Sequence, residues 1–327
     1  MRLGTLRGLD ACASDKGTFS VLALDHRNNL RRALAPDDPD SVSYERLVDI
    51  KRSIVRAIAP VADGILLDPD IGAGPVIHDG SRPSGCGLMN ALAETGYEGP
   101  STERRSRLIQ GWSVTQIKRV GADAVKLLLY YHPDAANAEL QERLLIEVAE
   151  CCADADIPLF LETLGYSLDP DVSKLTDEAR RDAVVRTARR LTALGGDVLK
   201  CEVPYDAGVT DRDRWAEACA ELDEASATPW VILSAGVDDA TFEAQTQVAC
   251  EAGASGVLVG RSVWKEGALM EGAERDRWLE TIGVARMQRL VDIVEATATP
   301  WRQCSALAQE PAPQQGWFSG YPGNPGD

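Results

Sequence analysis

Three ionisable side chains lie inside short apolar runs of the sequence, where a charge is costly unless it is paired. Lys126 follows Ala-Val and precedes three leucines, Glu162 lies between Phe-Leu and Thr-Leu, and Lys200 follows Val-Leu. These runs are typical of buried strands, so each charge would be removed from water. A buried lysine and a carboxylate can act together on a carbonyl compound, because the amine is a nucleophile and the carboxylate exchanges protons.

We interpret Lys200 as an amine that forms a Schiff base with a substrate carbonyl. A free lysine has a pKa of about 10.4, so its reactive neutral form is scarce near pH 7. Burial and a second nearby cation, Lys126, would both favour the neutral amine. Glu162 would shuttle the protons that imine formation and carbon–carbon cleavage require. The alternative is an internal salt bridge without catalysis, in which Glu202, two residues along the same strand face, neutralises Lys200.

Glycines at the ends of two later apolar runs indicate an anion site. Residues 233–237 (Leu-Ser-Ala-Gly-Val) and 258–262 (Leu-Val-Gly-Arg-Ser) would end the seventh and eighth strands. Backbone N–H groups at such turns bind phosphate oxygens, and an arginine adds a two-pronged donor. The residues expected at a phosphate are Ser234, Gly236, Gly260 and Arg261.

Other reactive side chains give weaker signals. The three histidines, at positions 26, 78 and 132, lack the spacing of a zinc site, so neither a metal nor a cofactor is expected. Only His26, beside Asp25 at the end of an apolar run, looks like a site residue. Cys201 follows Lys200, and neighbouring strand residues point to opposite faces, so Cys201 should face the helices. No P-loop or G-x-G-x-x-G motif is present.

The elements that would position these residues alternate between short apolar runs and longer amphipathic segments. Such alternation predicts a parallel sheet with crossover helices, and eight units in about 250 residues favour a single (β/α)8 TIM barrel, of the α/β class, over residues 1–304. Asp25 and Asp68, which close two runs, would lie at the carboxyl-terminal rim. Residues 305–327, rich in Pro, Gly and Gln, are predicted to be a disordered tail. The predicted strands are 19–25, 64–68, 124–131, 158–164, 198–204, 230–236 and 256–260, with an eighth, third in order, within 85–93, and the clearest predicted helices are 44–59, 179–194 and 241–252.

Composition limits the classes of partner. The formal net charge of −17 argues against nucleic acid or an anionic membrane, so an anionic small molecule would need a locally basic pocket. No window has the length and apolar character of a membrane span, and the first residues do not form a signal peptide. Eight cysteines show no C-x-x-C spacing and are interpreted as reduced thiols of a cytoplasmic protein. A homo-oligomer is expected.

The chain resembles the class I tagatose-1,6-bisphosphate aldolases and the related bacterial sulfofructose-phosphate aldolases. The resemblance extends in order to about residue 301 and implies the TIM-barrel fold. The matching stretches are Ala23-Leu-Asp-His-Arg27, Leu66-Leu-Asp-Pro69, Gly121-Ala-Asp-Ala-Val-Lys-Leu-Leu-Leu-Tyr-Tyr131, Phe160-Leu-Glu162, Asp197-Val-Leu-Lys-Cys-Glu-Val-Pro204, Leu233-Ser-Ala-Gly-Val237 and Gly256-Val-Leu-Val-Gly-Arg261.

The resemblance implies roles for residues of this chain. Lys200 would be the Schiff-base lysine, Glu162 the proton shuttle and Lys126 a supporting cation. Asp25 and Arg27 would lie at the substrate, and Ser234, Gly236, Gly260 and Arg261 at the phosphate of the dihydroxyacetone-phosphate half. The chain has His26 where the family usually has Gln between Asp25 and Arg27, which leaves recognition of the second half of the substrate open.

These observations predict an aldolase that cleaves a phosphorylated ketohexose. Tagatose 1,6-bisphosphate is the first candidate substrate and 6-deoxy-6-sulfofructose 1-phosphate the second. Residues 66–70, 95–97 and 130–131 resemble the first subgroup, whereas residues 229–234, 251–256 and 288–294 resemble the second. A transaldolase would use the same imine chemistry. A non-catalytic sugar-phosphate sensor is the alternative of another class, but binding alone needs no Schiff-base lysine.

Overall fold

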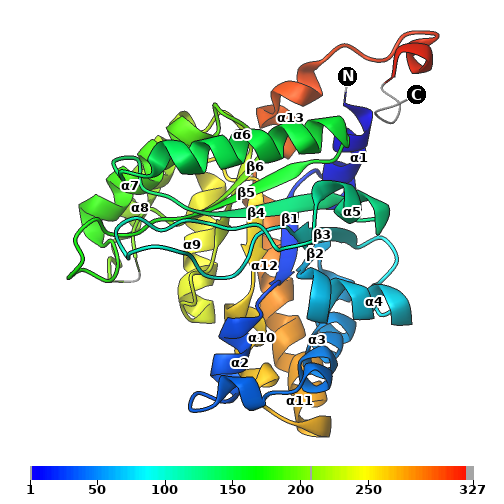
Figure 1. The fold of residues 1–327 in the computed structure, drawn as a ribbon, viewed down its shortest axis with the longest axis vertical. Coiled ribbons are helices and arrows are strands. Elements are labelled where there is room, and N and C mark those ends of the chain that lie inside the picture. Colours follow the sequence, from blue (N-terminus) through cyan, green and yellow to red (C-terminus); the bar gives the residue numbers. More distant parts are fainter. Residues whose placement is uncertain (1, 207, 322–327) are drawn as a thin grey trace.

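The computed structural model describes residues 2–206 and 208–321, and its centre is a closed barrel of eight parallel strands (Figure 1). Each strand pairs with its neighbours in chain order, and β1 pairs with β8 to close the barrel. The predicted (β/α)8 barrel is therefore confirmed. The strands are β1 Phe19–Leu24, β2 Gly64–Leu67, β3 Gly87–Ala91, β4 Ala124–Tyr130, β5 Leu159–Leu164, β6 Val198–Glu202, β7 Trp230–Leu233 and β8 Gly256–Val259.

The predicted strands are all present, each slightly shorter than its apolar run. The third strand lies within residues 85–93, where the sequence was hardest to interpret because it is rich in glycine and proline. The last residues of several runs, such as Asp25 and Asp68, leave the ladder and begin the loops that follow the strands. These loops gather at one end of the barrel, because all eight strands run in the same direction.

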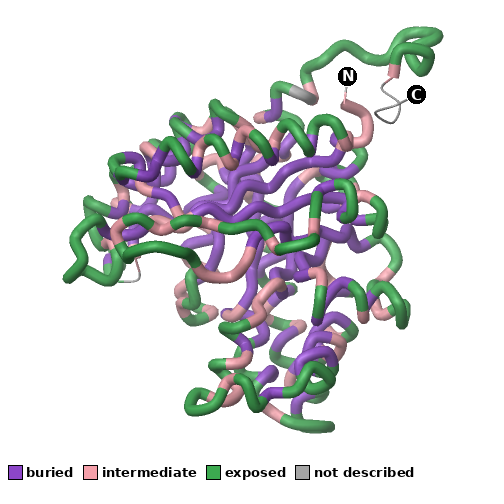
Figure 2. Tube along the Cα trace, viewed as in Figure 1, coloured by how far each residue is buried: buried purple, intermediate pink, exposed green. Residues whose placement is uncertain are grey.

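Helices surround the barrel and bury one face each (Figures 1 and 2). The three predicted helices are confirmed as α3 Tyr44–Ile58, α7 Asp177–Leu191 and α9 Asp239–Glu251. The side chain of Ser43 caps α3 by accepting from the N–H of Arg46. The other α-helices are α1 Leu3–Ala11, α2 Asn28–Leu34, α4 Gly74–Asp79, α5 Val114–Arg119, α6 Ala138–Asp154, α8 Arg212–Ala225, α10 Arg261–Ala268, α11 Gly272–Trp278, α12 Val284–Thr297 and α13 Trp301–Cys304. Short 3-10 helices span Pro39–Ser41, Ala59–Val61, Ala306–Gln309 and Trp317–Gly320, and π-helices span Pro69–Ala73 and Leu279–Gly283. None of the helices in the described ranges is long and apolar enough to cross a membrane.

The core has two parts, which correspond to the two faces of the strands. One fills the space between barrel and helices, and the other fills the barrel itself. At the amino-terminal ends of the strands, Leu9 of α1 and Trp301 of α13 join the interior cluster, both fully buried, and close that end. The residues of the interior cluster are Leu9, Cys12, Phe19, Val21, Ala23, Leu66, Met89, Ala91, Ala124, Phe160, Val198, Val231, Leu258 and Trp301.

The segment after α13 extends away from the barrel beside the chain's amino-terminal end (Figure 1). The N–H of Gly4 donates to the hydroxyl of Tyr321 at 3.1 Å, which connects this segment to α1. That residues 305–327 are disordered stays a prediction, and residues 322–327 lie outside the described part of the chain.

A fully buried ion pair connects α3 with the ends of β1 and β2. Lys51 of α3 contacts Asp68 and donates to the carbonyl oxygen of Leu24 at 2.7 Å. Asp68 also accepts from the N–H groups of Asp70 and Ile71 at 3.1 and 2.9 Å, and so caps the helix that follows β2. Asp68 lies at a strand end, as predicted, but it holds the loops in place rather than facing open space.

We predict that Lys51→Met lowers the free energy of unfolding by about 3–5 kcal/mol, because it leaves the Asp68 carboxylate buried without a cation. The double variant Lys51→Met/Asp68→Asn should recover part of this loss, since the amide is uncharged and its oxygen still caps the helix. Urea denaturation measures both effects. Arg107→Met, which breaks the exposed pair with Glu98, is the control and should cost less than about 1 kcal/mol. Equal losses for Lys51→Met and the control would contradict the prediction.

Candidate active site

The alternation of strand side chains brings the predicted residues together at the carboxyl-terminal end of the barrel. On β1, β4, β5 and β6, the inward positions change from apolar to polar toward this end. Ala23 is followed two residues later by Asp25, Ala124 by Lys126, Phe160 by Glu162 and Val198 by Lys200.

These polar side chains line a cavity of about 350 Å³ above the apolar interior of the barrel. Of the ten predicted site residues, eight line it and two, Arg27 and Gly236, do not. The eight are Asp25, His26, Lys126, Glu162, Lys200, Ser234, Gly260 and Arg261.

Four of these residues form one buried ion cluster. The Nζ atom of Lys126 lies 2.8 Å from Asp25 and 2.5 Å from Glu162, and the Nζ atom of Lys200 lies 3.0 Å from the same Oε2 atom of Glu162. Their side chains are between 4% and 14% exposed, so water screens the charges weakly. A carboxylate in contact with two amines can receive a proton from either of them.

The electrostatics of the cluster keep Lys126 charged. Burial disfavours its ammonium group, but the carboxylates of Asp25 and Glu162 outweigh that cost and raise the pKa of Lys126. Burial likewise opposes ionisation of Asp25 and Glu162, yet the two lysines prevail and lower the pKa of each carboxyl. The charge of Lys126 is thus balanced by two carboxylates, and Glu162 lies between Lys126 and Lys200.

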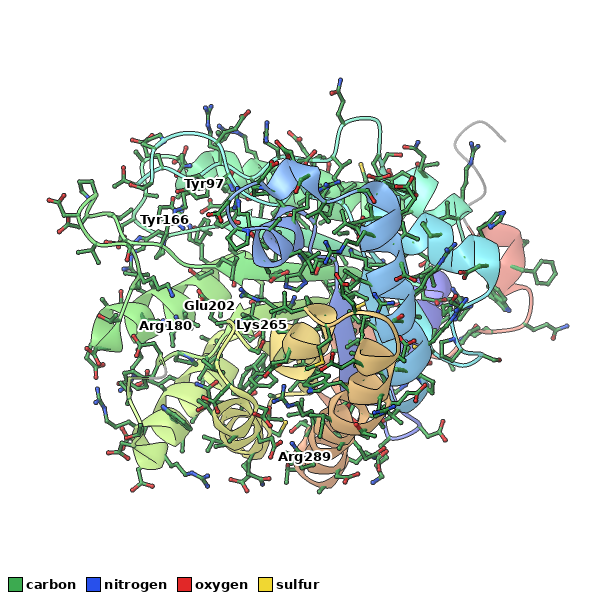
Figure 3. All side chains as sticks on the ribbon, turned by 90° about the horizontal axis from the view of Figure 1, so that it is seen from below. Tyr97, Tyr166, Arg180, Glu202, Lys265 and Arg289 are labelled. Atoms are coloured by element: carbon green, nitrogen blue, oxygen red, sulfur yellow. The ribbon has the colours of Figure 1, made fainter. Side chains whose placement is uncertain are left out.

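Glu202 has partners other than Lys200. Its Oε2 atom accepts from the N–H of Gly165 at 2.9 Å, and its Oε1 atom lies 3.3 Å from Arg180. Figure 3 shows Arg180 and Glu202 side by side. The pairing of Lys200 with Glu202 that the sequence left open is therefore not formed, and Glu162 is the carboxylate at the lysine. Cys201 packs in the outer core, on the helix side of β6, as predicted.

His26 enters the cavity as a neutral imidazole. Burial lowers the pKa of His26 to about 4, even though Asp25 lies 3.8 Å away and favours the charged form. The ring packs edge-to-face on Trp264, with centroids 5.1 Å apart. Trp264 is itself fixed by a 3.1 Å hydrogen bond from its indole nitrogen to the carbonyl oxygen of Ala23. A neutral imidazole offers one donor and one acceptor to a substrate hydroxyl.

Arg27 points away from the cavity toward the segment after β3. It donates to the carbonyl oxygen of Ala93 at 3.1 Å and lies 3.4 Å from Glu94. Arg27 therefore orders the wall of the cavity, because Ala93 and Glu94 both line it.

The turn after β7 and the start of α10 form the glycine-rich end of the cavity. Ala235 and Gly236 both have positive φ, +49° and +86°, and Ala235 is strained there because it has a Cβ atom. A Cβ atom on Gly236 would lie 3.1 Å from the guanidinium of Arg261, so glycine permits the close approach of the arginine. Burial lowers the pKa of Arg261, which has no carboxylate partner among the described residues. This arrangement suits an anion.

Several lining residues were missed in the sequence. Three of them lie on loops, Asn29 lies in the first turn of α2, and Tyr130 ends β4, so none is a charged residue inside an apolar run. They are Asn29, Glu94, Thr95, Tyr130 and Lys174.

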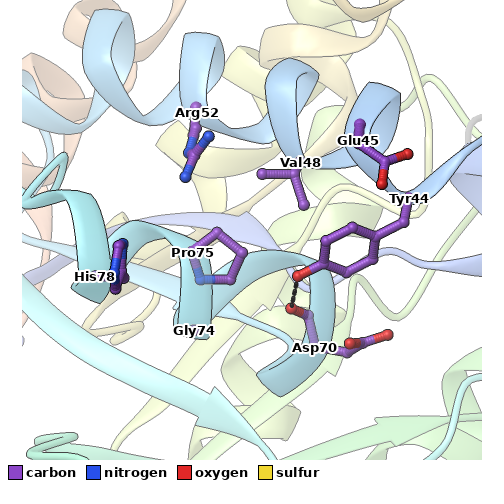
Figure 4. Close-up of a pocket in the computed structure, with 8 residues that line it drawn as sticks. All are labelled: Tyr44, Glu45, Val48, Arg52, Asp70, Gly74, Pro75 and His78. Carbon is purple, nitrogen blue, oxygen red and sulfur yellow. Dashed lines mark hydrogen bonds between the residues drawn. The ribbon is translucent and has the colours of Figure 1, made fainter.

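An open groove of about 440 Å³ lies elsewhere, between α3 and the helices after β2 (Figure 4). Its lining includes Arg52 and His78, and the hydroxyl of Tyr44 donates to the carbonyl oxygen of Asp70 at 3.4 Å. It contains none of the predicted site residues.

Comparisons with known proteins identify the family of the chain. A tagatose 1,6-diphosphate aldolase of Streptococcus agalactiae is 34% identical over 321 residues, which cover 89% of this chain and 95% of the relative. An enzyme of the same name from Staphylococcus aureus is 32% identical over 322 residues, which cover 91% of this chain and 97% of the relative. Among solved structures, an archaeal fructose 1,6-bisphosphate aldolase matches with a TM-score of 0.57 at 20% identity, over 88% of this chain and 98% of that one, which supports the fold. The profile of the DeoC/LacD family aldolases matches residues 19–266, and the chain belongs to this family.

Proposed function

We propose that the protein is a class I aldolase that cleaves tagatose 1,6-bisphosphate to dihydroxyacetone phosphate and glyceraldehyde 3-phosphate. The observation that carries the proposal is the buried amine of Lys200, 3.0 Å from the carboxylate of Glu162, in a cavity with a glycine-rich anion site at one end. The names of the relatives from Streptococcus agalactiae and Staphylococcus aureus support the choice of sugar.

In the first half-reaction, Lys200 transfers a proton to Glu162, and its neutral amine attacks the C2 carbonyl of the ketose and forms a carbinolamine. Loss of water from this intermediate requires an acid, and Glu162, once protonated, donates to the departing hydroxyl. The product is a protonated imine on Lys200. Lys126 stays protonated throughout and holds Asp25 and Glu162 in place.

Carbon–carbon cleavage then uses the imine as an electron sink. Glu162, now ionised, accepts the proton of the C4 hydroxyl, the C3–C4 bond breaks, and the electron pair moves into an enamine. The aldehyde leaves, C3 of the enamine takes up a proton, and water hydrolyses the imine to release dihydroxyacetone phosphate. One carboxylate thus serves as acid and base in turn, which is consistent with its position between two amines.

The phosphate of the dihydroxyacetone-phosphate half is assigned to the glycine-rich end of the cavity. Ser234 supplies a hydroxyl, the turns at Gly236 and Gly260 supply backbone N–H groups, and Arg261 supplies the cation. Asp25 and neutral His26 are assigned to hydroxyl groups of the sugar.

One observation favours 6-deoxy-6-sulfofructose 1-phosphate as a second candidate substrate. The part of the cavity formed by β1, β3 and β4 is lined by His26, Asn29, Glu94, Thr95 and Tyr130, and its one cation, Lys126, is already paired with two carboxylates. A sulfonate carries a single negative charge and needs less compensation than a phosphate dianion.

Cleavage of the two candidate sugars, assayed side by side with purified enzyme, tests the choice between them. A higher kcat/KM for tagatose 1,6-bisphosphate is expected. A higher kcat/KM for the sulfonated sugar would replace the first candidate by the second, and cleavage of neither would reject the proposed function.

We further propose that the enzyme works in the cytoplasm, where its thiols stay reduced. All eight cysteines are free in the structure. A homo-oligomer stays a prediction.

Borohydride reduction in the presence of dihydroxyacetone phosphate should attach a three-carbon adduct to Lys200, because reduction traps the imine. Peptide mapping by mass spectrometry locates the adduct. Lys200→Met should form no adduct there and lower kcat by at least about 10³-fold, since the covalent route is lost. An adduct on Lys126, or near-normal turnover in Lys200→Met, would overturn the assignment.

Glu162→Gln should lower kcat by about 10²-fold or more, because an amide can neither accept nor donate the proton that each step moves. Affinity for dihydroxyacetone phosphate should change much less, as the phosphate site is unaltered. Steady-state and single-turnover kinetics separate the two effects. The same substitution at exposed Glu98 is the control. Unchanged turnover in Glu162→Gln would remove this residue from the mechanism.

A further inference from the structure

Most of the charges that line the catalytic cavity are already in ion pairs before any substrate binds. Four carboxylates and four basic side chains line it, and His26 is neutral. Lys126 and Lys200 are already in ion pairs, so their charges are compensated. A phosphate ester must therefore be recognised by cations that are not yet neutralised. The four carboxylates are those of Asp25, Glu94, Glu162 and Glu202, and the four basic side chains are Lys126, Lys174, Lys200 and Arg261.

Two of the four cations meet this condition. Arg261, at the start of α10, and Lys174, in the loop between β5 and α7, form no ion pair within residues 2–206 and 208–321. Arg261 is already assigned to the phosphate. Lys174 gave no signal in the sequence, because it lies in a polar loop rather than in an apolar run.

Lys174 and Arg261 both lie near the turn after β7. The guanidinium of Arg261 packs against Gly236 of this turn. Lys174 lines the catalytic cavity together with Ser234 and Ala235. It also lines an adjoining cavity of about 330 Å³, whose wall includes Ser234, Ala235 and Gly236. The turn therefore separates the two cavities, and Lys174 lies at both.

The loop that carries Lys174 is weakly packed. Residues 168–174 are all exposed, including two apolar side chains, Leu168 at 36% and Val172 at 44%. A lysine on such a segment is a flexible point charge that can move onto an anion. Closure of the loop over a ligand would also remove some apolar surface from water.

We propose that Lys174 is a second cation of the phosphate site, which binds the same phosphate as Arg261 from the loop after β5. A dianionic phosphate with two cationic partners gains charge-assisted hydrogen bonds that one arginine cannot supply alone. The proposal rests on the proposed function in taking dihydroxyacetone phosphate as the ligand. It assigns this residue to the half of the substrate that stays on Lys200, not to the half that leaves.

Dihydroxyacetone, which has the same carbonyl but no phosphate, isolates this contact. The concentration that gives half-maximal borohydride-trapped adduct is measured for dihydroxyacetone phosphate and for dihydroxyacetone. Lys174→Met should raise this half-maximal concentration about fivefold to tenfold for dihydroxyacetone phosphate and leave it unchanged for dihydroxyacetone. Lys16→Met is the matched control, because Lys16 is exposed and precedes β1 at the opposite end of the barrel. It should change neither value.

Two outcomes would overturn the proposal. In the first, Lys174→Met leaves the half-maximal concentration of dihydroxyacetone phosphate as in the wild type. In the second, it raises only the KM for the complete ketose, which would assign Lys174 to the other end of the sugar. Failure of the wild-type enzyme to form any adduct would instead reject the proposed imine chemistry. Calorimetric binding of inorganic phosphate needs no imine, so weaker phosphate binding in Lys174→Met than in Lys16→Met would still support the phosphate site.

Discussion

Four charged side chains, Asp25, Lys126, Glu162 and Lys200, lie almost out of water at one end of the barrel, and each depends on the others. Burial alone would oppose ionisation of every member. In the cluster, negative and positive side chains alternate, each in contact with the next, so the attraction between neighbours offsets the loss of hydration. Loss of Lys126 would leave Asp25 without its counter-charge, and loss of Glu162 would leave Lys200 without one.

The barrel can hold such a cluster because the side chains that point into it are apolar in one layer and polar in the next layer toward the carboxyl-terminal end. In the pairing of β5 with β6, Glu162 lies opposite Lys200, which sets their contact. Below them, Phe160 and Val198 exclude water. A register shift of one residue on either strand would turn its charge toward the helices. The buried pair of Lys51 and Asp68 supports this arrangement from outside, because it fixes the carbonyl that precedes Asp25.

The alternation of apolar runs and amphipathic segments predicted the strands and the barrel. The meeting of Lys126, Glu162 and Lys200 in one cavity was predictable because a charge inside an apolar run is a rare and local signal. The sequence could not predict side-chain direction beyond a strand end. Arg27 follows two residues that line the cavity, yet its side chain turns to Glu94. Glu202 lies two residues after Lys200 on the same face of the strand, yet it pairs with Arg180 on a helix. Partners far apart in the chain, as well as loop residues such as Lys174, depend on how helices and loops pack, which no local pattern encodes.

The apolar plug at the amino-terminal end of the barrel has a consequence for the order of events. With Leu9 and Trp301 closing that end, the cavity opens toward the carboxyl-terminal end of the barrel. Substrate and both products must pass the same opening. In the proposed mechanism, the half attached to Lys200 cannot leave until its bond is hydrolysed, so the aldehyde departs first, and water enters the space that the aldehyde vacates. Added aldehyde would occupy that space again and drive the enamine back toward ketose.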